Sequence, residues 1–387
     1  MRGGNTKDIV STKGGVLTQK IIAMDAWHCS VPVNARRDHG IGSVEGNVDV
    51  VIVRLTSESG EQGYGEASPW PVFCGTAESS MAAFSRYFVP HVIGASVADM
   101  NKVMRVCEKC VVHSSDAKAA LETAWLDLSG KLLSLPVHNL LGGKVRDTIA
   151  LSVSIANPDF DHDKALAERI YADGIRLVKV KTGFKDHAFD VMRIEWLKEK
   201  FPDFTVRIDY NQGLDPFDSV RVLQDIDALD VSFIEQPVAA RHWQCMRELR
   251  QAISTPLLAD ESVFTPTDMM RAVQEEICDA VSIKIMKCGG PVRGKEIAAI
   301  AEAAGLAAYG GDMFETGVAH LAGVHMIAST PNISLGCEFY QATYYLEEDL
   351  LVSDFPIKNG QVVVPDEPGL GMMVDEERVQ KYTVSKS

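Results

Sequence analysis

Residues 177–183 read Leu-Val-Lys-Val-Lys-Thr-Gly, and this stretch predicts a short buried strand that is closed by a glycine turn. Because side chains alternate between the two faces of a strand, Lys179 and Lys181 share one face. Two ammonium groups on the inner face of an apolar strand are costly to bury unless they are paired or used in chemistry. A neighbouring cation and partial desolvation both disfavour a charged ammonium group, so Lys181 is a candidate base. The alternative is an edge strand with two solvated lysines.

Six later apolar runs repeat this arrangement, because each is short and ends in a charged residue. Counted from Lys181, these charged residues follow one another at intervals of 24 to 28 residues. A strand, a loop and a helix together need about this length, so the spacing predicts successive strand–helix units. The runs are Val206–Asp209, Phe233–Glu235, Leu257–Asp260, Val281–Lys284, Tyr309–Asp312 and Ser334–Glu338. An earlier run, Ile149–Ile155, brings the number of predicted strands to eight.

Eight parallel strands that alternate with helices predict a TIM-like α/β barrel. Active-site residues of such barrels lie at the carboxyl ends of the strands, which is where the charged residues fall. Asp209, Glu235 and Asp260 end three consecutive strands, so their carboxylates are expected to converge and repel one another. A hard divalent cation is the natural partner, and all-oxygen ligation favours Mg²⁺, with Mn²⁺ as the alternative.

The lysines complete the predicted chemistry. Lys179 and Lys181 are expected on one side of the metal, and Lys284 across the barrel. A metal flanked by opposed lysines suits the removal or delivery of a proton beside a carboxylate, because the metal stabilises the resulting enolate. The sequence therefore predicts an enzyme that acts on a small carboxylate substrate.

Several short motifs surround these residues. They are Gly63–Ala67 (GYGEA), Leu140–Gly143 (LLGG), Lys179–Lys181 (KVK), Asp209–Asn211 (DYN), Ile234–Pro237 (IEQP), Ala259–Ser262 (ADES), Lys284–Pro291 (KIMKCGGP) and Tyr309–Glu315 (YGGDMFE). Taken in this order, they resemble the enolase superfamily, in its mandelate racemase/muconate lactonising enzyme family and the muconate cycloisomerase subgroup. The resemblance spans about residues 20 to 380, and it is specific as an ordered set.

The resemblance implies a role for each matching residue. Asp209, Glu235 and Asp260 correspond to Mg²⁺ ligands, while Lys181 and Lys284 correspond to an acid/base pair. Lys179 is expected to assist Lys181. Members of this family have a (β/α)7β barrel, which lacks the last helix, and an N-terminal α+β capping domain completed by the C-terminal tail. They are commonly homo-oligomers, either dimers or octamers.

Four segments are expected along the chain. Residues 1–19 are polar and glycine-rich, which is typical of a flexible extension and not of a signal peptide. Residues 20–146 are expected to form the capping domain, and residues 147–350 the barrel with the active site. Residues 351–387 are expected to form the tail that packs on the capping domain.

Two loops of the capping domain are candidates for closing the active site. The polar segment Pro32–Asn47 has the length of a lid. Its Arg36, Arg37 and His39 either meet a substrate anion or form a solvated face. In the second loop, Trp70 and Phe73 either form an apolar wall of the site or pack in the core.

Other polar residues lie close to the predicted ligands. Asn211 shares a face with Asp209 and could hold a metal-bound water. Glu261 is expected to support the ligands from behind by pairing with a lysine. Lys287 is interpreted as solvated or structural.

The ends of the last two strands carry further carboxylates. Asp312 and Glu315 follow the seventh strand, which in the family is a position that contacts the substrate. Relatives often have a small residue in place of Asp312, so its negative charge favours a cationic group in the substrate. Glu338 matches a carboxylate often found in lactonising enzymes. His320 and His325 are interpreted as core or surface residues.

Composition limits the partners. The net charge of −15 argues against nucleic acid and anionic membrane as partners. The apolar runs are shorter than a membrane span, and the absence of a targeting segment suggests the cytoplasm. The eight cysteines are scattered, and the lone CxxC motif at Cys107–Cys110 lacks a second pair, so neither disulfides nor a zinc site is expected.

The expected half-reaction is compatible with several outcomes. A cycloisomerase is the first choice, because the Tyr309–Glu315 segment most resembles those enzymes. Asp312 favours instead a racemase or epimerase of a proline betaine, an N-acyl amino acid or a dipeptide, and an acid dehydratase is also compatible. Two further alternatives are a non-catalytic ligand-binding barrel and an aldolase-type Schiff-base barrel. The second of these leaves the three aligned carboxylates without a function.

Overall fold

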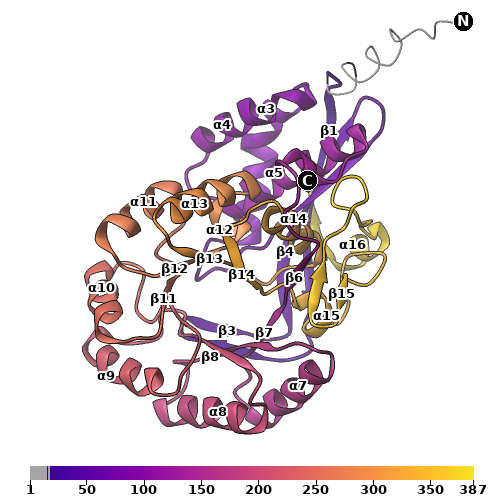
Figure 1. Cartoon of the computed structure of the whole chain (residues 1–387). Helices are drawn as coiled ribbons and strands as arrows, with labels where there is room; N and C mark the ends of the chain where they lie inside the picture. Colours follow the sequence, from indigo (N-terminus) through magenta and orange to yellow (C-terminus); the bar gives the residue numbers. More distant parts are fainter. Residues whose placement is uncertain (1–14, 16–17) are drawn as a thin grey trace, which may run out of the picture.

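The chain forms a barrel and a smaller capping domain that packs against it (Figure 1). The computed structural model describes residue 15 and residues 18–387, so most of the predicted extension 1–19 lies outside the described residues. Gln19 is already bonded to the capping domain. Its backbone oxygen accepts a hydrogen bond from Val97 N (2.9 Å), and its side-chain oxygen accepts one from Ser59 N (3.0 Å).

Eight parallel strands form one sheet in the order β14-β13-β12-β11-β10-β9-β8-β7. They are β7 (Ser152–Ile155), β8 (Leu177–Lys181), β9 (Thr205–Asp209), β10 (Ile234–Glu235), β11 (Leu257–Ala259), β12 (Ala280–Ile283), β13 (Ala307–Gly310) and β14 (Ile333–Cys337). A parallel bridge between Leu151 and Cys337 joins the first strand to the last. The sheet is therefore closed into a barrel.

Helices follow the first seven strands and surround the barrel (Figure 1). They are α7 (Phe160–Ala172), α8 (His187–Lys200), α9 (Pro216–Asp227), α10 (Trp243–Ala252), α11 (Pro266–Glu275), α13 (Pro291–Ala303) and α14 (Gly317–Ala328), with the short α12 (Ile285–Cys288) before α13. After β14 the chain forms the one-turn α15 (Gln341–Tyr344) and leaves the barrel. The predicted (β/α)7β architecture is confirmed.

The first barrel strand is shorter than the sequence predicts. The run Ile149–Ile155 divides at Leu151 into β6 (Thr148–Ala150) and β7. β6 pairs antiparallel with β16 (Gln361–Val363) of the tail, whereas β7 pairs parallel with β8. Both halves of the run are apolar and alternate in the same way, so the pattern carries no sign that the chain changes sheets.

The capping domain is built on an antiparallel sheet in the order β17-β1-β4-β5. These strands are β1 (Ile21–Pro32), β4 (Asn47–Ser57), β5 (Gln62–Ala67) and β17 (Thr383–Lys386), and the helices are α2 (Ala77–Ala82), η1 (Ala83–Phe88), α3 (Val89–Val92), η2 (Val97–Asp99), α4 (Met100–Cys110), α5 (Ser115–Leu133) and α6 (Val137–Leu140). α5 lies directly on β5, because a Cβ added at Gly65 would come within 2.0 Å of Ala120 O. The GYGEA motif therefore needs glycine at this position.

The tail returns to the capping domain. It contains β15 (Ile357–Lys358), β16, α16 (Glu376–Tyr382) and β17. β17 pairs with β1, with Trp27 opposite Lys386. Leu370 N also donates a hydrogen bond to Asp127 Oδ1 on α5 (2.8 Å). The capping domain is thus completed by the end of the chain, as the predicted fold class requires.

The polar segment Pro32–Asn47 contains a small hairpin of β2 (Arg37–His39) and β3 (Gly42–Val44). Asp38 N donates to Ala156 O at the end of β7 (2.9 Å). The turn at Gly40 lies on the loop after β9, because a Cβ added there would come within 2.1 Å of Tyr210 O. The hairpin therefore covers the carboxyl end of the barrel, where the sequence predicts a lid.

Two buried carboxylates of the capping domain bind the N-termini of barrel helices. Glu66 on β5 accepts hydrogen bonds from Thr316 N (2.8 Å) and Ala319 N (3.1 Å) at the start of α14. Glu122 on α5 accepts one from Val292 N at the start of α13 (2.8 Å). Backbone N–H groups at a helix start have no partner within the helix, so these contacts stabilise the two-domain arrangement.

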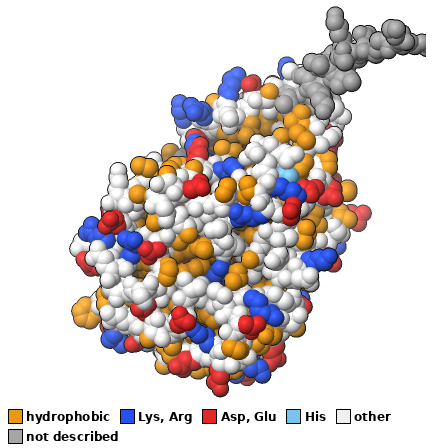
Figure 2. Space-filling model, viewed as in Figure 1, with side chains coloured by type: hydrophobic (Ala, Val, Ile, Leu, Met, Phe, Trp, Pro, Cys, Tyr) orange, Lys and Arg blue, Asp and Glu red, His pale blue; other side chains and the backbone are white. Residues whose placement is uncertain are grey.

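The surface is mixed in charge. On the face drawn in Figure 2, acidic and basic side chains are interspersed. All eight cysteines are free, including Cys107 and Cys110 of α4. Within residues 18–387 no helix has the length and apolar character needed to cross a membrane.

Candidate active site

The two lysines predicted as the acid/base pair meet at a small cavity of about 30 Å³ at the carboxyl ends of the strands. Lys181 ends β8 and Lys284 follows β12, and both line this cavity. The other lining residues are His39, Trp70, Phe73, Ser154, Asn211, Asp312, Met313, Phe314, Tyr340 and Gln341. Because β8 and β12 lie four strands apart in a sheet of eight, the two lysines approach the cavity from opposite sides.

Lys179 and Lys181 share the carboxylate of Asp209. Its Oδ2 lies 2.6 Å from Lys181 Nζ and 3.3 Å from Lys179 Nζ. Lys179 also pairs with Glu235 Oε2 (2.9 Å) and with Glu338 Oε2 (2.5 Å). Lys179 is fully buried and does not line the cavity, so its charge acts on the carboxylates around it.

Asp260 is held by two lysines on the other side of the barrel. Lys284 Nζ lies 2.7 Å from its Oδ2. Lys287 Nζ donates to its Oδ1, to its backbone oxygen and to Ser282 O, each at 2.8 Å. The sequence left open whether Lys287 is solvated or structural. Lys287 is buried, so its role is structural.

The lysines and carboxylates shift one another's pKa values. Burial alone would raise the pKa values of Asp209 and Asp260, but their lysine partners hold the pKa of Asp209 well below its usual range and that of Asp260 at about 2. Burial and the charge of Asp209 raise the pKa of Glu235 to about 8. Burial opposes the charge of Lys284, yet Asp260 and its neighbours raise the pKa of that lysine above its usual range. Both aspartates are therefore ionised at neutral pH.

The oxygen atoms of this cluster fit a hard cation. Within the part of the chain that is described, no three His, Cys, Asp or Glu side chains are arranged to hold a metal ion as they stand. Even so, Glu235 Oε1, Glu261 Oε2 and Asn211 Oδ1 are buried without a hydrogen-bond partner among the described residues. Buried acceptors of this kind suit a divalent cation with oxygen ligands.

Glu261 and Asn211 support each other. Asn211 Nδ2 donates to Glu261 Oε1 (3.2 Å), and Asn211 N donates to Asp209 Oδ1 (2.8 Å). The expected pairing of Glu261 with a lysine is not found among the described ion pairs, so its partner is Asn211. Burial, followed by the charges of Asp260 and Asp209, raises the pKa of Glu261 to about 8.

Asp312 faces the cavity without a counter-ion. It is buried, and its Oδ2 accepts no hydrogen bond from the described residues. Burial and the charge of Glu338 raise its pKa well above the usual range. His320 Nε2 lies 3.7 Å away, but burial lowers the pKa of that histidine to about 4, so the ring is neutral at pH 7.

Glu315 and Glu338 lie behind the cavity wall. Glu315 Oε1 accepts a hydrogen bond from Met313 N (3.2 Å), and burial with the charge of Asp312 raises its pKa well above the usual range. Glu338 accepts from Ser154 Oγ (2.6 Å) and pairs with Lys179. Neither carboxylate lines the cavity.

The three hairpin residues have different environments. Arg36 is exposed and pairs with Asp38 (2.8 Å). Arg37 is buried beside Tyr340 and does not line the active-site cavity. His39 does line it, and burial and the charge of Lys181 lower its pKa well below the usual range. The sequence left open whether these three residues meet a substrate anion or form a solvated face. Of the three, only His39 lines the active-site cavity.

The aromatic residues of the second loop form a wall of the cavity. The Trp70 ring packs edge to face against Phe314, with 5.2 Å between the centroids. The Phe73 ring lies 4.8 Å from Lys284 Nζ. The sequence left open whether Trp70 and Phe73 form an apolar wall of the site or pack in the core. The structure supports the apolar wall, because both line the cavity.

Sequence reasoning did not single out Ser154, Tyr340 or Gln341, although all three line the cavity. Gln341 Oε1 accepts a hydrogen bond from Glu315 N (2.6 Å), so it fixes the loop that carries Asp312. Ser154 lies on the inward face of β7, at the carboxyl end of the strand. Its position in the alternation of side chains along the strand was the signal in the sequence that could have placed it in the site.

Capped barrels with lysines and carboxylates at these strand ends form the enolase class of enzymes, and comparison with known proteins places the chain more narrowly. Residues 19–142 match the model for the mandelate racemase / muconate lactonizing enzyme N-terminal domain. Residues 162–378 match the model for the enolase C-terminal domain-like family. The chain therefore belongs to the mandelate racemase/muconate lactonizing enzyme family of the enolase superfamily, as its motifs predict.

Known relatives cover nearly the whole chain. Muconate cycloisomerase 1 of Rhodococcus opacus is 31% identical over 348 residues, which is 86% of this chain and 91% of that protein. L-Ala-D/L-Glu epimerase of Bacillus subtilis is 30% identical over 359 residues, covering 92% and 97%. The crystal structure of a muconate cycloisomerase from Azorhizobium caulinodans is 40% identical and covers 95% and 99%, with a TM-score of 0.82.

These relatives confirm that the chain is an isomerase. Cycloisomerases, which were the first choice from the sequence, and epimerases, which were the alternative, are both found among them.

Proposed function

We propose that the chain moves a proton at the carbon next to a substrate carboxylate, with Mg²⁺ held by Asp209, Glu235 and Asp260. Mn²⁺ has the same preference for oxygen ligands and is the alternative. When bound, the cation supplies the positive charge that stabilises negative charge developing on the substrate carboxylate. The buried oxygen atoms without partners at Glu235 and Glu261 support this assignment.

The two cavity lysines are the groups that move the proton. Lys181 Nζ and Lys284 Nζ are each held by an aspartate, at 2.6 Å and 2.7 Å. Since they approach from opposite sides, one can take a proton from one face of the substrate while the other returns it to the opposite face. Lys179, buried among Glu235, Glu338 and Asp209, supports Lys181 through the shared Asp209.

The observation that favours one reaction over the others is the Asp312 carboxyl group, whose Oδ2 has no hydrogen-bond partner among the described residues. It faces a cavity whose walls include Trp70, Phe73 and Phe314. A carboxylate among aromatic rings suits an ammonium group, because ring faces attract cations. A cation beside Asp312 would also offset the desolvation that raises its pKa. The geometry therefore favours a racemase or epimerase that acts on a compact amino-acid derivative with a substituted ammonium group.

A cycloisomerase is the second candidate. The 40% identical structure is that of a muconate cycloisomerase, and the two cavity lysines of this chain are compatible with the same chemistry. A muconate is a dicarboxylate, however, and it offers no cationic group to Asp312 Oδ2, which has no hydrogen-bond partner among the described residues. For this reason the geometry ranks cycloisomerisation below epimerisation.

The cavity has room for only a few water-sized groups. A substrate therefore requires the hairpin β2–β3 or the loop of Trp70 and Phe73 to move outward before it enters. Both segments belong to the capping domain and cover the barrel mouth, so closure over the substrate would exclude water from the lysines.

The test is proton exchange in D₂O with Mg²⁺. Substrates would include N-alkylated prolines and betaines, N-acyl amino acids, dipeptides, muconates and lactones, with mass and chirality read together. We expect deuterium to enter at Cα with inversion for a substituted ammonium substrate. Ring closure of a muconate with one deuterium would establish the cycloisomerase instead, and loss of water would establish a dehydratase.

The role of Asp312 is tested separately. Asp312→Asn should raise KM for the ammonium substrate by roughly tenfold or more, because one charge-assisted contact is lost. Glu315→Gln is the matched control, since Glu315 is a buried carboxylate nearby that does not line the cavity. Equal effects of the two changes would remove Asp312 from the substrate site.

The localisation, the oligomeric state and the partners of the protein are further proposals. We propose a cytoplasmic homo-oligomer, a dimer or an octamer, with no nucleic-acid or membrane partner. The net charge of −15 supports the absence of polyanionic partners. Sedimentation velocity across a range of protein concentrations would give the oligomeric state, and a monomer at every concentration would contradict the proposal.

A further inference from the structure

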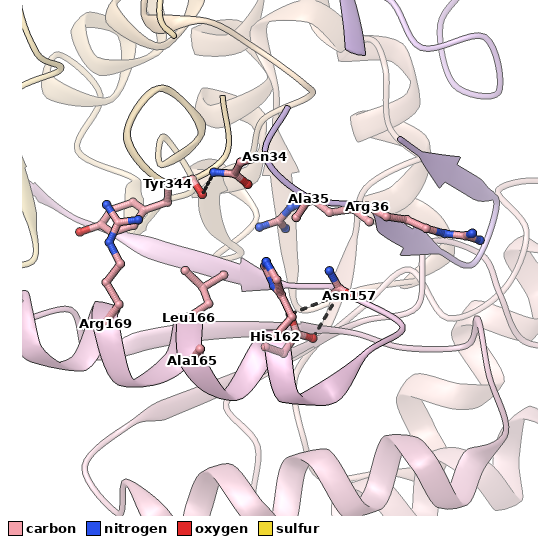
Figure 3. A pocket seen from close by; sticks show the side chains of 11 residues that line it. Asn34, Ala35, Arg36, Asn157, His162, Ala165, Leu166, Arg169 and Tyr344 are labelled. Atoms are coloured by element: carbon pink, nitrogen blue, oxygen red, sulfur yellow. Dashed lines mark hydrogen bonds between the residues drawn. The ribbon is translucent and has the colours of Figure 1, made fainter. Parts of the chain in front are cut away.

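A second cavity lies outside the active site. It has a volume of about 260 Å³ and lies between the base of the β2–β3 hairpin, α7 and Tyr344 of α15 (Figure 3). Arg37, Arg169 and His162 line it together with Asn157. None of these residues lines the active-site cavity.

Arg37 brings a buried positive charge to this cavity. The residue is 4% exposed. Its guanidinium forms no ion pair with a carboxylate of the described residues, although the charges of Asp163 and Asp312 favour its charged form. Its carbon Cζ lies 4.6 Å from the centre of the Tyr345 ring and 5.1 Å from that of Tyr340. These rings stabilise the charge but accept none of its N–H groups, and NH1 has no hydrogen-bond partner among the described residues. A buried guanidinium with free donors favours an anionic ligand.

Other donors face the same space. In Figure 3, Arg169 extends from α7 toward Tyr344, and its Cζ lies 4.7 Å from that ring. The side chains of His162 and Asn157 point into the cavity from below. The side-chain oxygen of Asn157 already accepts a hydrogen bond from Asp159 N (2.8 Å), which leaves its amide N–H groups for a ligand. Arg36 points away along the hairpin (Figure 3), so it is not part of the donor set.

One acidic side chain lines the cavity, and it is already engaged. Asp163 accepts two hydrogen bonds of 3.1 Å from Asn157 N, and Arg193 NH1 lies 3.9 Å from it. Burial raises the pKa of Asp163 to about 6 despite these contacts. Asp163 is therefore largely ionised at pH 7, but its single negative charge lies near Arg193 and stands against the two positive charges of Arg37 and Arg169.

We propose that this cavity binds a small oxyanion, phosphate or carboxylate, through Arg37 and Arg169. Guanidinium groups form paired, charge-assisted hydrogen bonds with both kinds of anion. Nothing in the chemistry of the active site requires this second site, so the proposal stands independently of the proposed reaction.

The position of the site gives the ligand a second effect. Arg37 belongs to β2 and Arg169 to α7, so an anion held by both joins the hairpin to the barrel. His39, two residues further along β2, lines the active-site cavity. The backbone N–H of Asp38, which lies between Arg37 and His39 in the chain, donates to Ala156 O of the barrel (2.9 Å). Binding is therefore expected to restrain the hairpin in the position that covers the active site.

The test is calorimetric titration of the full chain with inorganic phosphate, and separately with succinate, at constant ionic strength. We expect saturable binding of at least one anion, and Arg169→Met should weaken it roughly tenfold or more. Arg221→Met is the matched control, because Arg221 is an exposed arginine on α9 that does not line the cavity. Hydrogen exchange of the Asp38 amide should slow when the anion is present.

Each outcome bears on the proposal. Saturable binding of phosphate or succinate that Arg169→Met weakens and Arg221→Met leaves unchanged would support the site, and the anion that binds would identify its ligand chemistry. No saturable binding of either anion, or an equal loss in Arg169→Met and Arg221→Met, would overturn it. Arg37→Lys retains the charge but not the paired donors, so it should also weaken binding, and unchanged affinity in that variant would remove Arg37 from the site. Unchanged exchange at Asp38 would overturn the link to the hairpin.

Discussion

Lys287 holds Asp260 through two hydrogen bonds, one to Oδ1 and one to the backbone oxygen, both of 2.8 Å. The remaining carboxylate oxygen lies 2.7 Å from Lys284. The two lysines on Asp260 thus have different surroundings, because Lys284 lines the cavity and Lys287 does not. Lys287 therefore positions the carboxylate, while Lys284 can reach a substrate.

Lys287→Met should lower the free energy of unfolding by roughly 3–5 kcal/mol, because it removes one partner of a buried ion pair together with its hydrogen bonds to Asp260 O and Ser282 O. Urea denaturation measures this. Lys284→Met is the matched change, since Asp260 keeps Lys287 there and the expected loss is smaller. If both variants lost the same stability, the positioning role of Lys287 would be wrong.

Lys181→Ala and Lys284→Ala should each reduce turnover by at least about 10²-fold, because each removes one group that transfers a proton. The fold, read by circular dichroism, and the Mg²⁺ affinity should be retained. In a reaction with one base on each face, each variant should lose Cα exchange for one stereoisomer and keep part of it for the other. Full activity in either variant would contradict its assignment.

Asp209→Asn should weaken Mg²⁺ binding about tenfold or more, because an amide lacks the negative charge that attracts a hard cation. Titration calorimetry measures the change directly. Asp312→Asn is the control, since Asp312 faces the cavity without belonging to the predicted ligand set. Removal of Mg²⁺ by a chelator should stop proton exchange, and added Mn²⁺ should restore it. Unchanged affinity in Asp209→Asn would remove this residue from the ligand set.

The regular spacing of strand ends made the barrel predictable. From β8 onward, each strand ends in or is closely followed by a charged residue, so Lys181, Asp209 and Glu235 could be placed at one edge of the sheet from their intervals alone. The division of the run Ile149–Ile155 was not predictable, because which sheet each half joins depends on the distant tail strand β16.

Residues that act through distant contacts were harder to interpret. Arg37 and His39 are two residues apart in one polar segment, yet they line different cavities. Period-two alternation puts both on the same face of β2, and only the position of the hairpin on the barrel separates their surroundings. For Lys287 the sequence likewise left a solvated and a structural role open, because its partners, Asp260 after β11 and Ser282 on β12, are brought to it by the fold.

The contact between the two domains predicts a pH dependence of stability. Glu122 on α5 is buried, and burial raises its pKa from 4.5 to about 7, an effect that the hydrogen bond from Val292 N only partly offsets. Between these two pH values the folded protein keeps the proton on Glu122 while the unfolded chain has released it. The contribution of Glu122 therefore lowers the free energy of unfolding as pH rises through this window, and the contribution levels off above it.

Glu122→Gln should remove this dependence, because glutamine cannot ionise and can still accept the hydrogen bond from Val292 N. The variant's advantage in unfolding free energy over the parent should be roughly 2 kcal/mol larger at pH 8 than at pH 5. Urea denaturation at the two pH values measures it, with Glu168→Gln as the control at an exposed position on α7. An equal difference at both pH values would show that Glu122 is not the titrating group, and the buried carboxylate would then have to be ionised throughout this range.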